Sequence, residues 1–188
     1  MKQAKTLTPQ ELRHAMGQAA MSRHAQRNKA MLLLTHLAGM RVGEVAALRV
    51  ADVLDADGNV RNEIRLQAHQ TKGNEGRTVF LNERLQKEIA LYARTLRSKA
   101  PASPFFVTQK RTGFSANSLT QHFIIQYKRA GLDGATSHSG RRTFLTSLAS
   151  QGVSVRVLAA LAGHKSIQTT QRYIDVNDNM LRNAVELV

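Results

Sequence analysis

The chain has 188 residues, of which 42% are hydrophobic, so it is long enough to form one globular domain with a substantial core. Its 27 Lys and Arg against 13 Asp and Glu give a formal net charge of +14, which favours a nucleic-acid partner over a ribosomal-type role or a merely solvated basic surface. It has no cysteine, which excludes disulfides, Cys-ligated zinc and Cys nucleophiles. The N-terminus lacks the apolar core of a signal peptide, and the longest apolar runs (30–34 and 157–162) are too short to span a membrane, so we expect a cytoplasmic protein.

The N-terminal part of the chain is predicted to be helical. The run Thr-Pro-Gln-Glu at 8–11 is typical of a capped helix start with proline in its first turn, so a helix is expected from there to about residue 21. Apolar residues at helical spacing predict a second helix over 23–37. Gly39 ends it, and a short helix is expected over 43–48.

The period then changes to that of strands. Residues 50–54, 64–66 and 78–81 predict a small three-stranded antiparallel sheet. Asp57-Gly58 marks one turn, and the glycine-containing segment 71–76 marks the turn between the last two strands.

The remainder is predicted to be helical, which makes the fold α+β but mainly α. The expected helices cover 82–96, 117–130, 139–150, 154–162, 166–174 and 178–186. Ser137 and Ser166 stand where helix caps are expected. The proline-containing loop at 100–104 does not mark a domain boundary.

Tyr173 is the candidate nucleophile. Tyr92 and Tyr127 lie on apolar helix faces, as core residues do, whereas Tyr173 lies in a polar stretch beside Arg172. A tyrosine hydroxyl, with a pKa of about 10, reacts well only where cations lower that pKa or a base takes the proton. Packing remains the alternative role for any single tyrosine.

His138 and Arg141 form a second candidate pair. They stand three residues apart at the start of a helix, so they share a face and can reach one ligand. Cations oppose the dipole at a helix N-terminus, which suggests a bound anion there; a solvated basic first turn is the alternative.

Arg41 and Lys72 are further candidates for binding or protonating a phosphate. Arg41 lies between glycines, and Glu44 is placed to hold its guanidinium, whose fork fits two phosphate oxygens. An ordinary surface ion pair is the alternative. Lys72 lies at a predicted hairpin tip, where it is either simply exposed or, in a cleft, able to protonate a leaving alkoxide.

His164 precedes the helix that leads to Tyr173 and is expected at the mouth of the same pocket. A metal site on His138 and His164 is disfavoured because their neighbours are Arg and Lys and a third ligand at suitable spacing is missing from the sequence. The predicted chemistry requires neither a metal nor any other cofactor.

These residues together resemble the catalytic domain of the tyrosine recombinase (phage integrase) family over almost the whole chain, about residues 7–185. The resemblance rests on the ordered set Ala-Gly-Met-Arg-Val-Gly-Glu at 38–44, Thr-Lys-Gly at 71–73, His-Ser-Gly-Arg-Arg-Thr at 138–143, Ala-Gly-His at 162–164 and Tyr173. The chain departs from the family pattern at Gly140, Arg142 and Ala162, and none of these departures removes a catalytic group.

The resemblance implies a site-specific DNA recombinase or integrase that works through a 3′-phosphotyrosine intermediate. Arg41 and Arg141 would clamp the phosphate, with Glu44 in support, and Lys72 would act as general acid on the 5′-oxygen. His138 would transfer a proton, His164 would bond the phosphate and Tyr173 would attack it. A DNA-binding regulator or a relaxing enzyme of the type IB topoisomerase kind is the alternative.

The resemblance also implies double-stranded DNA as partner, a homo-tetramer on DNA and a monomer without it. Residues 1–188 would form one catalytic domain without the N-terminal DNA-gripping domain of most members, either as a naturally short protein or as an excised domain. The target sequence, the direction of recombination and any accessory DNA-bending proteins are not specified by the sequence.

Overall fold

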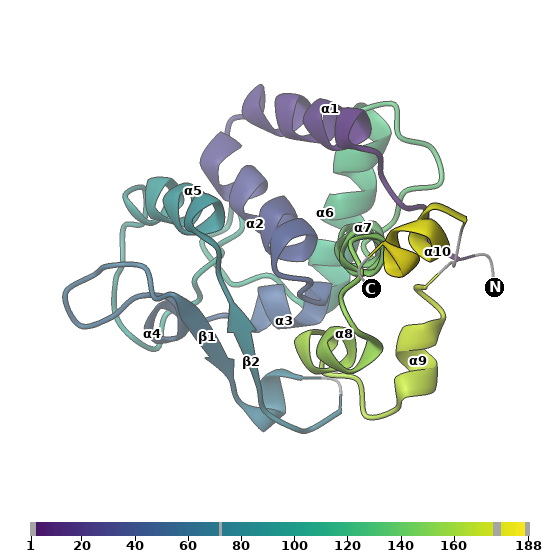
Figure 1. The fold of residues 1–188 in the computed structure, drawn as a ribbon. Helices are drawn as coiled ribbons and strands as arrows, with labels where there is room; N and C mark the ends of the chain where they lie inside the picture. The colour runs from purple at the N-terminus through teal and green to yellow at the C-terminus, as the bar shows by residue number, and fades with distance from the viewer. Residues whose placement is uncertain (1–2, 72, 175–177, 187–188) are drawn as a thin grey trace.

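The computed structural model describes residues 3–71, 73–174 and 178–186 (Figure 1). In chain order the elements are α1 (Pro9–Ala20), α2 (Ala25–Leu37), α3 (Val42–Ala47), α4 (Val50–Val53), β1 (Glu63–Leu66), η1 (Ala68–Gln70), β2 (Arg77–Phe80), α5 (Glu83–Ala93), α6 (Ala116–Arg129), α7 (Ser139–Ser150), α8 (Val155–Ala162), α9 (Ile167–Gln171) and α10 (Asp178–Val185). Within these ranges, every helix is too short or too polar to cross a membrane. The expectation of a mainly helical α+β fold is confirmed.

Helix α2 runs through the centre of the molecule and packs against α1, α5 and α7 (Figure 1). Residues 30–36 are all buried, so the helix has no solvent face over two turns. An α-helix with buried residues on every side belongs inside a domain, and the other helices assemble around it.

Close contact between α2 and α7 depends on Gly140. A Cβ at this position would overlap Thr35 Oγ1 and lie 2.7 Å from Thr35 Cβ. The glycine noted in the sequence as a departure from the family pattern is therefore required by this packing, which brings the first turn of α7 onto the end of α2.

The prediction of a three-stranded sheet was wrong for one strand. The described residues form a two-stranded antiparallel sheet of β1 and β2. Residues 50–53 form helix α4 instead. Val50, Val53 and Leu54 are all buried and follow helical i, i+3, i+4 spacing, and the backbone N–H of Arg49 donates to Asp52 Oδ2 at 2.8 Å across the first turn. The Asp57-Gly58 turn is confirmed, with Gly58 at φ +82°.

The other expected helices are present, with differences at some of their ends. Helix α9 ends at Gln171, so Tyr173 follows the helix rather than lying in it. Ser137 is not a cap, because His138 is the N-cap of α7. Ser166 is the N-cap of α9 as expected, although its side chain makes no capping hydrogen bond.

The core has two parts. The larger is built from α1 to α6 with both strands, and the smaller from Leu145, Ala149, Leu158 and Ala162 of α7 and α8. Figure 1 shows α8 between β2 and α9.

Candidate active site

Arg141 is held deep in the molecule by backbone carbonyls. The residue is only 3% exposed, and its guanidinium donates to Gly39 O and to Ala162 O, both at 2.6 Å. Burial, with the nearby charges of Arg41 and Arg77, lowers the pKa of Arg141 to about 9. The group remains a cation at neutral pH, and an anionic ligand would relieve the cost of its buried charge.

His164 is fixed between Arg141 and Thr170. Its Nε2 lies 2.9 Å from Arg141 Nη2, and its Nδ1 lies 2.9 Å from Thr170 Oγ1. A guanidinium can only donate, so Nε2 accepts, and the ring proton on Nδ1 is directed to Thr170. Burial, then the charges of Arg141, Arg41 and Arg77, lower the pKa of His164 to about 4, so the ring is neutral at pH 7.

Glu44 organises Arg41 at the start of α3. The backbone N–H of Arg41 donates to Glu44 Oε2 at 2.7 Å, and its guanidinium Nη1 lies 2.9 Å from Glu44 Oε1. Burial would raise the pKa of Glu44, but hydrogen bonds and charges from Arg77 and Arg41 outweigh it and lower the pKa. The carboxylate is therefore ionised, and the expected support of Arg41 by Glu44 is present in the structure.

Arg77 was missed in the sequence. Its guanidinium binds both carboxylate oxygens of Glu44, at 2.7 and 3.2 Å, and donates to Leu161 O at 2.8 Å. Side chains alternate between the two faces of a strand, so residue 77 lies on the same face as the buried Val79. A cation on the buried face of a predicted strand was the signal from which Arg77 could have been found. Thr170, the partner of His164, could not have been found from the sequence. It stands six residues after His164, and a threonine at this spacing belongs to no recognisable motif.

Tyr173 lies directly beyond α9, next to His164. The two rings stack with centroids 5.8 Å apart and planes 21° apart. The guanidinium of Arg142 lies 5.7 Å from the centroid of the Tyr173 ring, a contact that the sequence did not predict. The tyrosine is half-buried against the smaller core, with cations around its ring.

His138 and Lys72 complete the predicted set. His138 is an exposed residue one helical turn before Arg141, and its backbone carbonyl accepts the first hydrogen bond of α7, from Arg142 N at 2.9 Å. Lys72 lies outside the described residues, but its neighbours Thr71 and Gly73 line the pocket described next.

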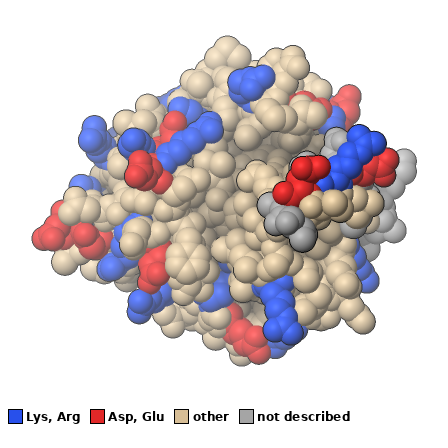
Figure 2. Space-filling model, in the orientation of Figure 1, with Lys and Arg blue, Asp and Glu red and all other residues tan. Residues whose placement is uncertain are grey.

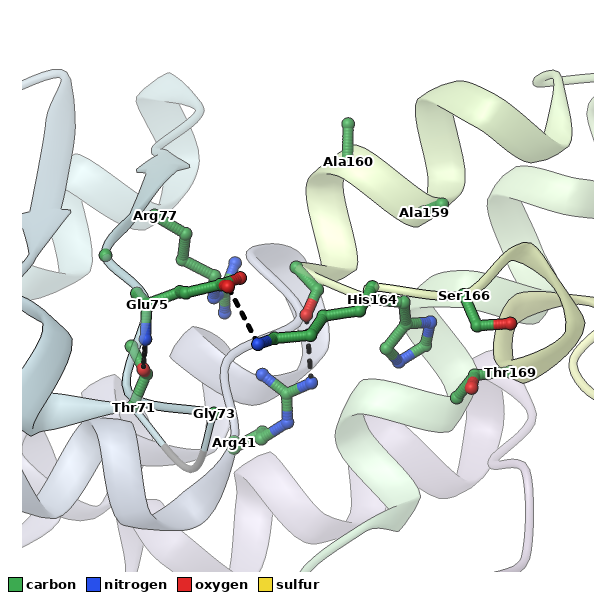
Figure 3. Close-up of a pocket in the computed structure, with 13 residues that line it drawn as sticks. Arg41, Thr71, Gly73, Glu75, Arg77, Ala159, Ala160, His164, Ser166 and Thr169 are labelled. Atoms are coloured by element: carbon green, nitrogen blue, oxygen red, sulfur yellow. Dashed lines mark hydrogen bonds and ion pairs between the residues drawn. The ribbon is translucent and has the colours of Figure 1, made fainter.

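A pocket of about 530 Å³ opens beside these residues. Figure 3 shows the side chains of Arg41 and His164 lying between the loop that carries Glu75 and the start of α9 at Ser166 and Thr169. Lys165 reaches across to Glu75 at 2.7 Å. The structure thus brings Arg41 and His164 together at the pocket, with Arg141 and Tyr173 in contact with His164.

Charges of both signs lie around this site, since Arg41, Arg77 and Lys165 line the pocket together with Glu75. In Figure 2, Lys and Arg are spread over the visible face with Asp and Glu among them. Over residues 3–71, 73–174 and 178–186, no cluster of three His, Asp or Glu side chains is placed to hold a metal ion. The residues in the site are suited to binding an anion directly.

The comparison with protein families identifies the class of protein. Residues 5–180 match the phage integrase family. The match extends over almost the whole sequence and includes all of the residues described above. The chain therefore belongs to the phage integrase family.

Two of the similar proteins are named tyrosine recombinases. The chain is 32% identical over 163 residues to tyrosine recombinase XerA of Pyrococcus horikoshii, covering 85% of this chain and 54% of the relative. It is 31% identical over 168 residues to tyrosine recombinase XerD of Neisseria meningitidis serogroup B, covering 87% and 55%. The chain thus spans little more than half the length of these curated relatives.

Solved structures share the fold. The crystal structure of a XerA recombinase matches with a TM-score of 0.78 at 26% identity, covering 100% of this chain and 66% of that one. The Tn1549 transposon integrase in complex with a circular intermediate DNA matches with a TM-score of 0.79, covering 100% and 67%; at 18% identity this second likeness concerns the fold alone.

Proposed function

We propose that this chain is the catalytic part of a site-specific DNA recombinase that cleaves and rejoins DNA strands through a 3′-phosphotyrosine intermediate. The observation that carries the proposal is the meeting of Arg41, Arg141 and His164 beside the ring of Tyr173. Cations that can bind phosphate oxygens lie next to a hydroxyl that can attack phosphorus, within a member of the phage integrase family.

In the proposed cleavage step, the Tyr173 oxygen forms a bond to phosphorus as the bond from phosphorus to the 5′-oxygen breaks. Arg41 and Arg141 bind the non-bridging oxygens, where charge develops. His138 accepts the tyrosine proton, and Lys72 donates a proton to the departing 5′-oxygen. A 5′-hydroxyl of another strand then attacks the phosphotyrosine and restores a phosphodiester.

His164 has to change its hydrogen bonding when DNA binds. In the structure its Nε2 accepts from Arg141, so it cannot donate to a phosphate in that form. An incoming phosphate draws the Arg141 guanidinium toward itself and favours a proton on Nε2. We therefore propose that His164 gains a proton, or exchanges tautomer, as the phosphate arrives.

We propose double-stranded DNA as the partner, bound by a homo-tetramer that forms on DNA from monomers. Related proteins have been solved with DNA, including the XerH recombinase bound to its difH substrate and a lambda integrase dimer bound to a core site. Leu181 and Val185 of α10 are 57% and 73% exposed, and this uncovered apolar face supports contact with a second copy of the chain.

Replacement of Tyr173 by phenylalanine tests the assignment of the nucleophile. Tyr173→Phe should abolish covalent adduct formation on nicked duplex DNA, because the hydroxyl is the only group lost, while DNA binding and melting temperature stay near those of the wild type. The duplexes can be drawn from a randomised pool, with adducts recovered on a denaturing gel and sequenced. Strand exchange between two recovered duplexes then separates a recombinase from a topoisomerase-like enzyme.

Tyr92→Phe is the matched control, since Tyr92 loses the same hydroxyl from a core position where it donates to Phe105 O. The Tyr92→Phe variant should have a slightly lower melting temperature and still form the adduct. A Tyr173→Phe protein that reacts would refute the assignment.

The reaction should not require a metal ion. The same assay in EDTA should give full activity, and a loss of activity that Mg²⁺ restores would refute the metal-free mechanism.

Replacement of Lys72 tests its role as general acid. Lys72→Ala should react poorly with an ordinary duplex but at nearly the wild-type rate with a 5′-phosphorothiolate, because the sulfur leaves without a proton. Equal loss of rate on both substrates would mean that Lys72 binds or positions the DNA instead.

A further inference from the structure

Three arginines from three elements meet at the C-terminal end of α8. Arg77 donates to Leu161 O at 2.8 Å, Arg141 to Ala162 O at 2.6 Å and Arg41 to Gly163 O at 3.4 Å. The last carbonyls of a helix have no partner within it and carry the negative end of its dipole. The end of α8 is thus the common anchor of the cations in the site.

Arg77 differs from the other two in how its donors are used. Its Nε and Nη2 bind Glu44 and its Nη1 binds Leu161 O, while its side chain is only 8% exposed. Arg77 lines the pocket, but each of its three nitrogens already donates a hydrogen bond to a protein group. We therefore expect its effect on the reaction to pass through the groups that it holds.

The first of those groups is Glu44, which Arg77 shares with Arg41. Each carboxylate oxygen accepts one hydrogen bond from each arginine. Two guanidinium ions around one carboxylate leave a net charge of +1. Without Arg77, Arg41 and Glu44 would form a neutral pair, and Arg41 would attract a phosphate less strongly.

The second group is the end of α8, from which His164 follows. Gly163 adopts φ +60°, and a Cβ there would lie 2.5 Å from Arg77 Cδ. The stem of Arg77 therefore lies directly against the turn that sets the position of His164. One side chain from β2 touches the supports of both Arg41 and His164.

We propose that Arg77 is a positioning residue for DNA cleavage. It keeps Arg41 available to the phosphate by sharing Glu44, and it fixes β2 to the end of α8 beside His164. This inference rests on the proposed recombinase function. It assigns a role to a residue that lies outside the predicted catalytic set and that its contacts in the structure identify.

The test compares Arg77→Met and Arg77→Lys with Arg65→Met. Arg65 is the matched control because it lies on the adjacent strand β1 with its side chain 80% exposed, so its loss removes the same charge without removing a buried contact. The single-turnover rate of adduct formation is measured at saturating DNA from the duplexes recovered above, well below each melting temperature.

Arg77→Met should slow adduct formation by about 10- to 100-fold at saturating DNA, as misplacement of a binding group does. Arg77→Lys, which keeps the charge but loses the planar fork, should recover part of that loss. Arg65→Met should change only the apparent affinity for DNA and its salt dependence.

A double-mutant cycle separates positioning from general stability. Because Arg77 acts through Arg41, Arg77→Met should cost much less in an Arg41→Ala background than in the wild type. Full additivity, or a wild-type rate for Arg77→Met at low temperature, would overturn the inference while the proposed function stands. Failure of the wild-type chain to form an adduct with any duplex would overturn the proposed function and this inference with it.

Discussion

The two halves of the site are held in different ways. Arg41 and Arg77 are fixed by ionic hydrogen bonds to the buried carboxylate of Glu44, beside the larger core. Arg141, His164 and Tyr173 are held by carbonyls, an imidazole and ring stacking, beside a small core with four buried residues. We therefore expect a bound phosphate to move the Arg41–Glu44–Arg77 half less than the Arg141–His164–Tyr173 half.

The largest expected effects come from truncating one arginine in each half. Arg41→Ala and Arg141→Ala should each slow adduct formation by at least about 10²-fold, as loss of one donor from an anion-stabilising site does. The two variants should differ in the titration of His164. Arg141 is the nearer charge and binds Nε2 directly, so its removal should raise the pKa of His164 from about 4 toward 6.5 more than removal of Arg41 does.

The imidazole shifts of His164 in NMR spectra measure this difference. Full titration curves of the two variants and the wild type are required, because adduct rates alone do not separate the two arginines. Equal pKa values for His164 in both variants would mean that the two halves are not held as differently as their contacts indicate.

Truncations in the two cores test the comparison between the two halves of the site, with a smaller expected effect on the rate of adduct formation. Leu85→Ala in the larger core and Leu158→Ala in the smaller one each remove a fully buried side chain, and each should lower the free energy of unfolding by about 2–5 kcal/mol. Only Leu158→Ala should also slow adduct formation well below its melting temperature, since Leu158 belongs to the cluster on which Tyr173 packs. Comparable losses of rate in both variants would contradict this division.

The acid sensitivity of the larger core gives a third test. Burial lowers the pKa of His36 to about 4, so the unfolded chain binds more protons between about pH 4 and 6.5. Stability should therefore rise with pH across this window and be lost as pH falls, with His36 contributing up to about 3 kcal/mol. His36→Gln keeps a polar group that can hydrogen-bond to Tyr127, and urea unfolding of this variant should show a shallower pH dependence.

Bound DNA should leave the His36 titration unchanged and raise the pKa of His164, because a phosphate reaches only the second of these rings. If NMR shows both histidines shifting together on DNA binding, the site and the larger core are coupled more tightly than proposed.

The sequence by itself determined most of the helices and the identity of the candidate residues. Proline and a capping box at residues 8–11 start α1 through local chemistry, and Gly39 and Gly163 adopt a positive φ that few other residues adopt. Such features depend on neighbours in the chain, so local patterns are sufficient to predict them. They predicted Arg41, Glu44, Arg141, His164 and Tyr173 as site residues, and the structure brings these side chains close together.

Only the tertiary structure decided the contacts between distant segments. Residues 50–54 satisfy both a strand and a helix pattern, and burial of the i, i+3, i+4 positions selects the helix. Arg77 joins Glu44 and Leu161 across 33 and 84 residues, and Arg141 joins Gly39 across 102. A guanidinium accepts any well-placed oxygen as a partner, so its choice is set by the packing of helices and strands and not by its neighbours in the sequence.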